Sequence, residues 1–174
     1  MTDIPDIEPY NDQDVPQVID RLIRDDEFIK IIGQLKFKGW YPPLSLFLKP
    51  RIRAFLRNQA KGVQTVEHFQ DLVAPQLAKV LASTTEKFTV SGLENLDPEQ
   101  AYLFLSNHRD IVMDPSFVNW ALYNGGFDTV RIAIGDNLVK KPFISDLMRI
   151  NKSFIVKRSV SGPREMFQAF SALS

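Results

Sequence analysis

The fold class follows from the stretch AYLFLSNHRDIVMDPSFVNWALY, residues 101–123. Its first five residues are apolar and typical of a buried strand. Asp114 is a typical helix cap, and a proline directly after the cap fits the first turn of a helix. The stretch therefore predicts a strand over 101–105, a turn, and a helix over 115–123.

The alternation of strand and helix continues on both sides of this stretch. Further strands are predicted at 88–90, 130–134 and 154–157, and further helices at 142–150 and from residue 163 onward. Strands that alternate with helices favour an α/β layer with a mainly parallel sheet. We therefore expect a partial, mainly parallel sheet flanked by helices.

The chain before residue 84 has only helical patterns. Apolar residues recur at helical spacing over 14–35, 44–58 and 63–83. Asp14 is the expected cap of the first pattern, and Pro50 is expected to kink or divide the second. The chain is therefore expected to have a mobile acidic tail at 1–12, a helical region at 13–84 and an α/β domain at 85–174, which ends within a predicted helix.

Composition excludes several classes of site. The 174 residues include no cysteine, which excludes a disulfide framework, a zinc–thiolate site and a cysteine nucleophile. The acidic N-terminus lacks the order of a signal peptide, and no apolar run approaches the roughly 20 residues that span a bilayer. We expect a soluble protein on the cytoplasmic side, or one peripheral to the membrane.

The formal net charge of zero hides an uneven distribution. The chain is acidic from Asp3 to Glu27, whereas 36–61 carries seven basic residues and no acidic one, and 140–164 carries seven basic residues and one acidic one. Such blocks are either solvated faces or binding surfaces for phosphate, nucleic acid or lipid headgroups. The first basic block is interleaved with aromatic residues, which also suits an anionic lipid surface; no nucleic-acid-binding motif accompanies it.

His108 follows the predicted strand 101–105, at the end where open α/β sheets bind their ligands. An imidazole can take a proton from a hydroxyl when a nearby carboxylate holds its ring in the right tautomer. His108 and Asp114 are therefore a candidate general-base pair, with Asp114 as a simple helix cap the alternative. Because the chain has no G-x-S-x-G segment, the substrate's own hydroxyl would be the nucleophile.

Two other interpretations of these residues are set aside. His108, Asp110 and Asp114 offer too few ligands for a metal site, so no metal is predicted. The order His108-Arg109-Asp110 resembles a protein-kinase catalytic loop, but Pro115 stands where that loop needs an asparagine.

Two segments resemble the glycerolipid acyltransferase family, which includes glycerol-3-phosphate and 1-acylglycerol-3-phosphate acyltransferases. The first is SNHRDIVMDP, residues 106–115, which is similar to the family's Asn-His, four residues and Asp, often followed by proline. The second is NKSFIVKRS, residues 151–159, which is similar to Gly-x-Phe-Phe-Ile-x-Arg. The segment between them, GDNLVKKPFISDLMRIN, also resembles the family's, and the similarity covers roughly residues 88–169.

The chain departs from the family pattern in two ways. Five residues, not four, separate His108 from Asp114, and Met113 occupies the expected acid position. Either Asp114, favoured by the following Pro115, or Asp110 is then the acid. The family's third motif, similar to Glu-Gly-Thr-Arg, is absent, so the chain resembles the N-terminal portion of such an enzyme.

The resemblance implies an O-acyltransferase of phospholipid biosynthesis that works without a cofactor. It would move a fatty acyl group from acyl-CoA or acyl carrier protein to a hydroxyl of glycerol phosphate or a lysophospholipid. His108 would be the general base and Asp114 would orient it, while Arg158, Lys157 and Arg109 are the candidates for binding the acceptor phosphate. An anionic membrane surface is an expected partner, and nucleic acid is not. The alternatives are a non-catalytic lipid-binding module of the same fold and a His-Asp thioesterase-like hydrolase.

Overall fold

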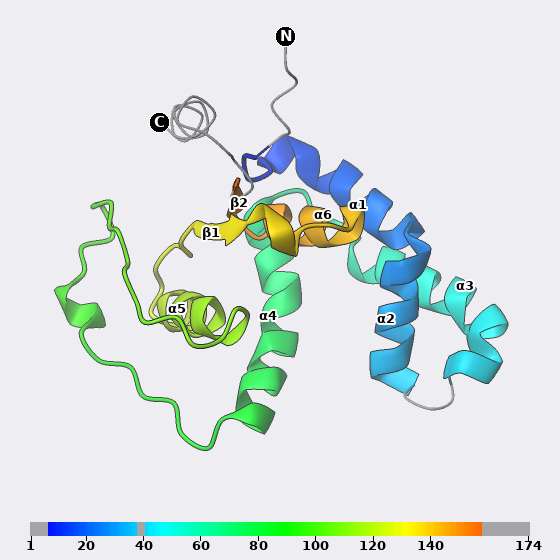
Figure 1. The fold of residues 1–174 in the computed structure, drawn as a ribbon, viewed down its shortest axis with the longest axis horizontal. Coiled ribbons are helices and arrows are strands. Elements are labelled where there is room, and N and C mark those ends of the chain that lie inside the picture. Colours follow the sequence, from blue (N-terminus) through cyan, green and yellow to red (C-terminus); the bar gives the residue numbers. More distant parts are fainter. Residues whose placement is uncertain (1–6, 38–40, 158–174) are drawn as a thin grey trace, which may run out of the picture. The chain divides into compact units, whose positions relative to one another are not determined.

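The computed structural model describes residues 7–37 and 41–157, which fall into two units (Figure 1). Unit 1 comprises Met1–Leu72 and Ala133–Ser174, and unit 2 comprises Val73–Ile132. The helices are α1 (Val15–Arg24), α2 (Asp26–Phe37), α3 (Tyr41–Gln59), α4 (Val66–Thr84), α5 (Met113–Asn124) and α6 (Pro142–Ile150). The strands are β1 (Ile132–Gly135) and β2 (Ser153–Val156), and short 3-10 helices lie at Asp12–Asp14, Leu93–Asn95 and Asp136–Leu138.

The strands β1 and β2 form a two-stranded parallel sheet, with α6 as the crossover between them. A parallel pair needs such a crossover, because its two strands run in the same direction. The helices α1 to α4 precede this β–α–β segment along the chain (Figure 1). The structure is therefore an α/β fold with a helical N-terminal region, as the sequence predicts.

The helix α1 begins where the sequence predicts it, directly after Asp14 and with Pro16 in its first turn. Its apolar residues recur at helical spacing and are buried: Val15, Val18, Ile19, Leu22 and Ile23. The carboxylate of Asp14 does not cap α1, however. It accepts a hydrogen bond from the backbone N–H of Asn11 at 3.0 Å and so closes the preceding 3-10 turn.

The helices α2 and α3 pack around a core of Ile29, Tyr41 and Ile52. Gly33 allows their close approach, because a Cβ at this position would lie 2.0 Å from Cε2 of Tyr41. α3 continues through Pro50 as a single helix, so of the two expected effects, a kink or a division, the division is wrong. Proline removes one hydrogen bond of the helix, but burial of Tyr41 and Ile52 on either side of it holds both halves against α2.

Two predicted strands are absent from the described residues. Residues 88–90 and 101–105 lie in a stretch without a partner strand, and a strand requires hydrogen bonds to a neighbour. The residues of 101–105 are not buried either: Leu103 is 85% exposed and Leu105 is 87% exposed. The prediction of a buried strand at 101–105 is therefore wrong in this structure.

Residues 7–10 are bonded to the β–α–β segment within unit 1. The N–H of Ile155 in β2 donates to the carbonyl of Ile7 at 2.8 Å, and the N–H of Tyr10 donates to the carbonyl of Arg149 at 3.1 Å. Residues 7–10 thus have fixed partners, where the sequence predicted a mobile tail over 1–12. Residues 1–6 lie outside the described residues.

A cluster of polar side chains also holds residues 7–10 against the β–α–β segment. Asp146 of α6 is 8% exposed and accepts two hydrogen bonds from the guanidinium of Arg21, at 2.8 and 3.0 Å. The hydroxyl of Tyr10 donates to the same carboxylate at 2.6 Å, and Arg149 lies over the Tyr10 ring at 4.0 Å. The cluster joins residue 10, α1 and α6 of unit 1.

None of the helices in the described ranges, 7–37 and 41–157, combines the length and the apolar character needed to cross a membrane.

Candidate active site

The helix α5 carries the candidate site and is held by contacts within unit 2. The ring of Phe117 stacks on that of Phe88, with centroids 5.1 Å apart. The side-chain carbonyl of Asn119, which is 7% exposed, accepts a hydrogen bond from the backbone N–H of Val130 at 2.9 Å. The segments before and after α5 therefore contact the middle of the helix. These contacts do not involve its N-terminal end, where the turn at 107–113 lies.

Asp110 caps the N-terminus of α5. Its Oδ1 accepts hydrogen bonds from the backbone N–H groups of Val112 and Met113, at 2.8 and 2.7 Å. The first amides of a helix have no partner within the helix, so a carboxylate there satisfies donors that would otherwise be lost. Asp110 thus supplies the cap that the sequence predicted at Asp114. The turn of the chain begins four residues before the position that Pro115 indicated.

Asp114 lies in the first turn of α5 and bonds back along the chain. Its Oδ2 accepts hydrogen bonds from the backbone N–H groups of Arg109 at 2.6 Å and Asp110 at 2.9 Å. The same oxygen lies 3.2 Å from Nδ1 of His108. Asp110 thus bonds forward and Asp114 bonds back across one turn, as in a capping box but with the two acids four residues apart, not three, and with the imidazole as a further partner of Asp114.

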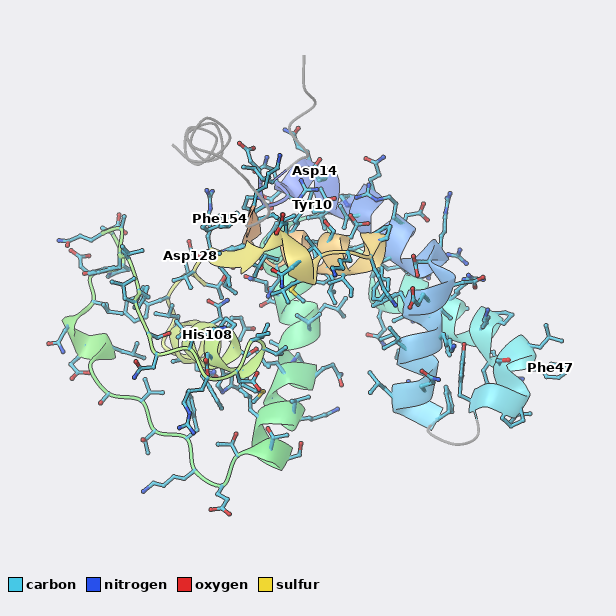
Figure 2. All side chains as sticks on the ribbon, viewed as in Figure 1. Tyr10, Asp14, Phe47, His108, Asp128 and Phe154 are labelled. Carbon is cyan, nitrogen blue, oxygen red and sulfur yellow. The ribbon has the colours of Figure 1, made fainter. Side chains whose placement is uncertain are left out.

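The geometry leaves the far side of the imidazole open. The side chain of His108 is 66% exposed, whereas that of Asp114 is 21% exposed, and Figure 2 shows His108 beside α5. A proton on Nδ1 that is donated to the carboxylate leaves the lone pair on Nε2, which can then accept a proton. Of the two acids that the sequence left open, Asp114 is the one that lies within reach of the ring in this structure.

Both carboxylates have lowered pKa values. The pKa of Asp114 is lowered by the backbone hydrogen bonds from Asp110 and Arg109, and further by the neighbouring His108. The pKa of Asp110 is lowered by the backbone hydrogen bonds from Met113 and Val112. Hydrogen bonds to the ionised form favour it, so both groups are anionic at neutral pH. A fixed anion next to Nδ1 is what a histidine base requires.

The residues predicted to bind phosphate are placed differently. Arg109 is exposed and directly follows His108 on the same turn of unit 2. Lys157 is half-buried and directly follows β2 in unit 1, and Arg158 lies outside the described residues. The structure thus brings together His108, Asp114 and the backbone of Arg109, and it describes Lys157 within the other unit.

One residue of the turn has a role that sequence reasoning missed. The sequence predicts Asp110 as an alternative partner for His108 and not as a cap, although Asp is among the preferred capping residues of a helix. Because Pro115 directly follows Asp114, the sequence predicted Asp114 as the cap instead. Over the described ranges, no group of three or more His, Cys, Asp and Glu side chains is arranged to hold a metal ion.

Comparison with known proteins places this turn in a family. Residues 87–171 match the family model described as Acyltransferase, and the matched range contains His108, Asp110 and Asp114. The chain has no significant match among curated proteins or among solved structures. The segment 87–171 of this chain belongs to the acyltransferase family.

Proposed function

We propose that the chain catalyses O-acyl transfer from an acyl thioester to a hydroxyl of glycerol phosphate or a lysophospholipid. The observation that carries the proposal is the contact of 3.2 Å between Nδ1 of His108 and Oδ2 of Asp114, inside a segment of the acyltransferase family. The ring is exposed on its other side, where a hydroxyl can approach Nε2. The family match supports acyl transfer in general, and the acceptor and the donor are part of the proposal.

The proposed reaction needs no nucleophile from the protein. Nε2 of His108 takes the proton of the acceptor hydroxyl while the oxygen of that hydroxyl attacks the thioester carbonyl. The carbon–sulfur bond of the tetrahedral intermediate then breaks, and the proton on Nε2 passes to the leaving thiolate. Asp114 holds the ring and stabilises the imidazolium that exists between the two steps. The products are an ester and a free thiol, of coenzyme A or of acyl carrier protein.

The acceptor phosphate would be bound by basic side chains. Arg109 is the candidate on the same turn as His108, and Arg158 with Lys157 is the candidate pair at the end of the second family-like segment. Arginine can bind phosphate through two parallel hydrogen bonds, which favours Arg158 over Lys157. A location on the cytoplasmic side, peripheral to a membrane, belongs to the same proposal.

The test is acyl transfer by the full chain from a radiolabelled acyl-CoA and from acyl carrier protein, with glycerol 3-phosphate and with 1-acylglycerol 3-phosphate. We expect a labelled ester with one acceptor, and a loss of about 10²- to 10⁴-fold in kcat for His108→Ala. Undiminished transfer by His108→Ala would contradict the assignment. Release of free fatty acid without an acceptor would identify a thioesterase-like hydrolase instead. Lipid binding without either reaction would identify a non-catalytic module.

A further inference from the structure

The helix α3 has two faces of different character. Tyr41 and Ile52 on its inner face are 2% and 4% exposed, and Leu48 and Leu56 pack against the same core. On the opposite side, Leu46 is 79% exposed. Phe47 is 70% exposed, and Figure 2 shows it at the outer side of the α2–α3 pair. Large apolar side chains are therefore present on both faces of one helix.

The exposed residues follow a line along the helix. At 3.6 residues per turn, Pro43, Phe47, Pro50 and Ala54 lie nearly above one another, opposite Ile52. All four are exposed. We define the α3 outer face as these four residues together with the residues that flank them, Leu46, Arg51 and Arg57.

The charges of α3 are divided between the two faces. Lys49 and Arg53 turn toward α2 and pair with Asp26, at 3.2 and 2.8 Å. Arg51 and Arg57 are exposed and lie on either side of the apolar line, and neither has an ion-pair partner in the described part of the chain. α3 contains no acidic residue. The outer face thus combines apolar side chains with positive charge that is not neutralised locally.

These two properties select the kind of partner. An exposed apolar patch on a soluble surface marks an interaction site, and arginines beside it require an anionic counterpart. A helix with an apolar line flanked by basic residues can lie in the plane of a lipid surface, with its apolar side chains at the boundary between headgroups and acyl chains. Anionic headgroups would then meet the two arginines.

We propose that the α3 outer face is a docking surface for an anionic lipid bilayer. Leu46 and Phe47 enter the boundary between headgroups and acyl chains, and Arg51 and Arg57 bind the anionic headgroups. The surface belongs to unit 1, whereas His108 and Asp114 belong to unit 2. The proposal rests on the membrane-peripheral location in the proposed function, but it does not rest on acyl transfer and is tested without measuring it.

The test is flotation of the full chain with two kinds of vesicle, one of phosphatidylcholine alone and one of phosphatidylcholine with about 30 mol% phosphatidylglycerol, which gives the surface a negative potential. We expect binding to the anionic vesicles that weakens as salt is raised. Leu46→Gln/Phe47→Gln should lower the binding constant about tenfold or more, since two apolar side chains leave the lipid. Arg51→Gln/Arg57→Gln should lower it about fivefold per arginine on anionic vesicles only.

The control makes substitutions of the same kind on another helix. Lys79 and Val80 are exposed on α4, and Val80 is 47% exposed. Lys79→Gln/Val80→Gln removes one exposed cation and one exposed apolar side chain and should leave binding within twofold of the unsubstituted chain. Circular dichroism and the melting temperature of each variant show whether it is folded, which separates a loss of the surface from a loss of the fold.

Three results would overturn the proposal. The first is no binding of the unsubstituted chain to either kind of vesicle. The second is equal binding to both kinds. The third is that the Leu46/Phe47 variant, folded, binds as well as the control. If that variant instead abolishes self-association in analytical ultracentrifugation while vesicles are not bound, the face is an interface between protein chains and the lipid proposal is wrong.

Discussion

Asp110 and Asp114 lie on one turn and bond in opposite directions along the chain. Asp110 accepts hydrogen bonds from the amides that follow it, of Val112 and Met113, whereas Asp114 accepts them from the amides of Arg109 and Asp110 that precede it. Only Asp114 also lies next to the His108 ring, at 3.2 Å. Two acids of the same type, four positions apart, therefore make separate sets of contacts.

Substitution of each acid should separate activity from stability. We expect Asp114→Asn to lower kcat by about 10²-fold or more, because the amide no longer stabilises an imidazolium on His108. Asp110→Ala should retain at least about a tenth of kcat and lower the melting temperature by about 2–4 °C, because the cap of α5 is lost. Steady-state kinetics and calorimetry on the same preparations give both quantities. The reverse pattern would make Asp110 the partner of the histidine.

The carboxylates should titrate below their ordinary range. The pKa of Asp114 is lowered in the folded chain by its backbone hydrogen bonds from Asp110 and Arg109, so its ionised form stabilises the turn. That stabilisation is present above the ordinary pKa of 3.8 and is lost as the pH falls through the lower, folded value. Carbon-13 NMR of the side-chain carboxyl should give a midpoint below 3.8. A loss of activity on acidification that begins well above that pH must then come from another group.

Gly33→Ala should destabilise unit 1. The added methyl would lie 2.0 Å from Cε2 of Tyr41, a ring that is only 2% exposed and cannot move aside without uncovering the α2–α3 core. Overpacking of this kind costs about 2–3 kcal/mol. Urea unfolding followed by circular dichroism measures the change.

Tyr41→Phe is the matched control for that substitution. The Tyr41 hydroxyl is buried without a hydrogen-bond partner among the described residues. Removing it should leave the free energy of unfolding unchanged or slightly raised, because no hydrogen bond is lost. A large loss of stability in this variant would show that the hydroxyl has a partner.

Asp146→Asn should weaken the attachment of residues 7–10. The substitution removes the charge that pairs with Arg21 and leaves Arg149, which is 6% exposed, beside an uncharged amide. Since the Arg21 side chain is 42% exposed, solvent screening reduces the cost to about 2 kcal/mol. The exposed pair of Arg24 and Asp20 supplies the control, and Asp20→Asn should change stability by less than about 0.5 kcal/mol. Equal effects of the two substitutions would contradict a special role for Asp146.

The same cluster should make stability fall at both extremes of pH. Burial opposes ionisation of Asp146, but the hydrogen bonds from Arg21 and Tyr10 outweigh it and lower its pKa. Its contribution is therefore lost as the pH falls below 3.8. Burial and the hydrogen bond to Asp146 raise the pKa of Tyr10 to about 12, so its contribution is lost as the pH rises from 10.0 toward that value. Melting temperatures across the pH range, compared with Tyr10→Phe, test both limits.

Local features were predictable from the sequence, and long-range pairings were not. The predicted helix at 142–150 coincides with α6, because proline in its first turn and a run of apolar residues are signals within one segment. The strand expected at 101–105 depended on a partner elsewhere in the chain, and apolar residues alone do not specify one. The bond between Arg21 and Asp146 joins residues 125 apart, and no pattern in the sequence indicates it. At the candidate site, the sequence offered two acids for His108, Asp114 and Asp110, and left the choice open. It did not predict the cap by Asp110, because Asp114 directly precedes Pro115 and so matched the usual pattern of a helix start.

The hydrogen bond between Tyr10 and Asp146 joins residues 136 apart, which sets an order of events during synthesis. At about 5–20 residues per second, a ribosome needs roughly 7 to 27 seconds to add the residues between them. For that interval the part of α1 that packs on α6 has no surface to cover it. The early chain therefore carries a partly uncovered apolar helix while translation continues, because the contacts of α1 with α2 and α3 can form before α6 is made, whereas those with α6 cannot. A chaperone that acts on nascent chains would bind α1 in this period.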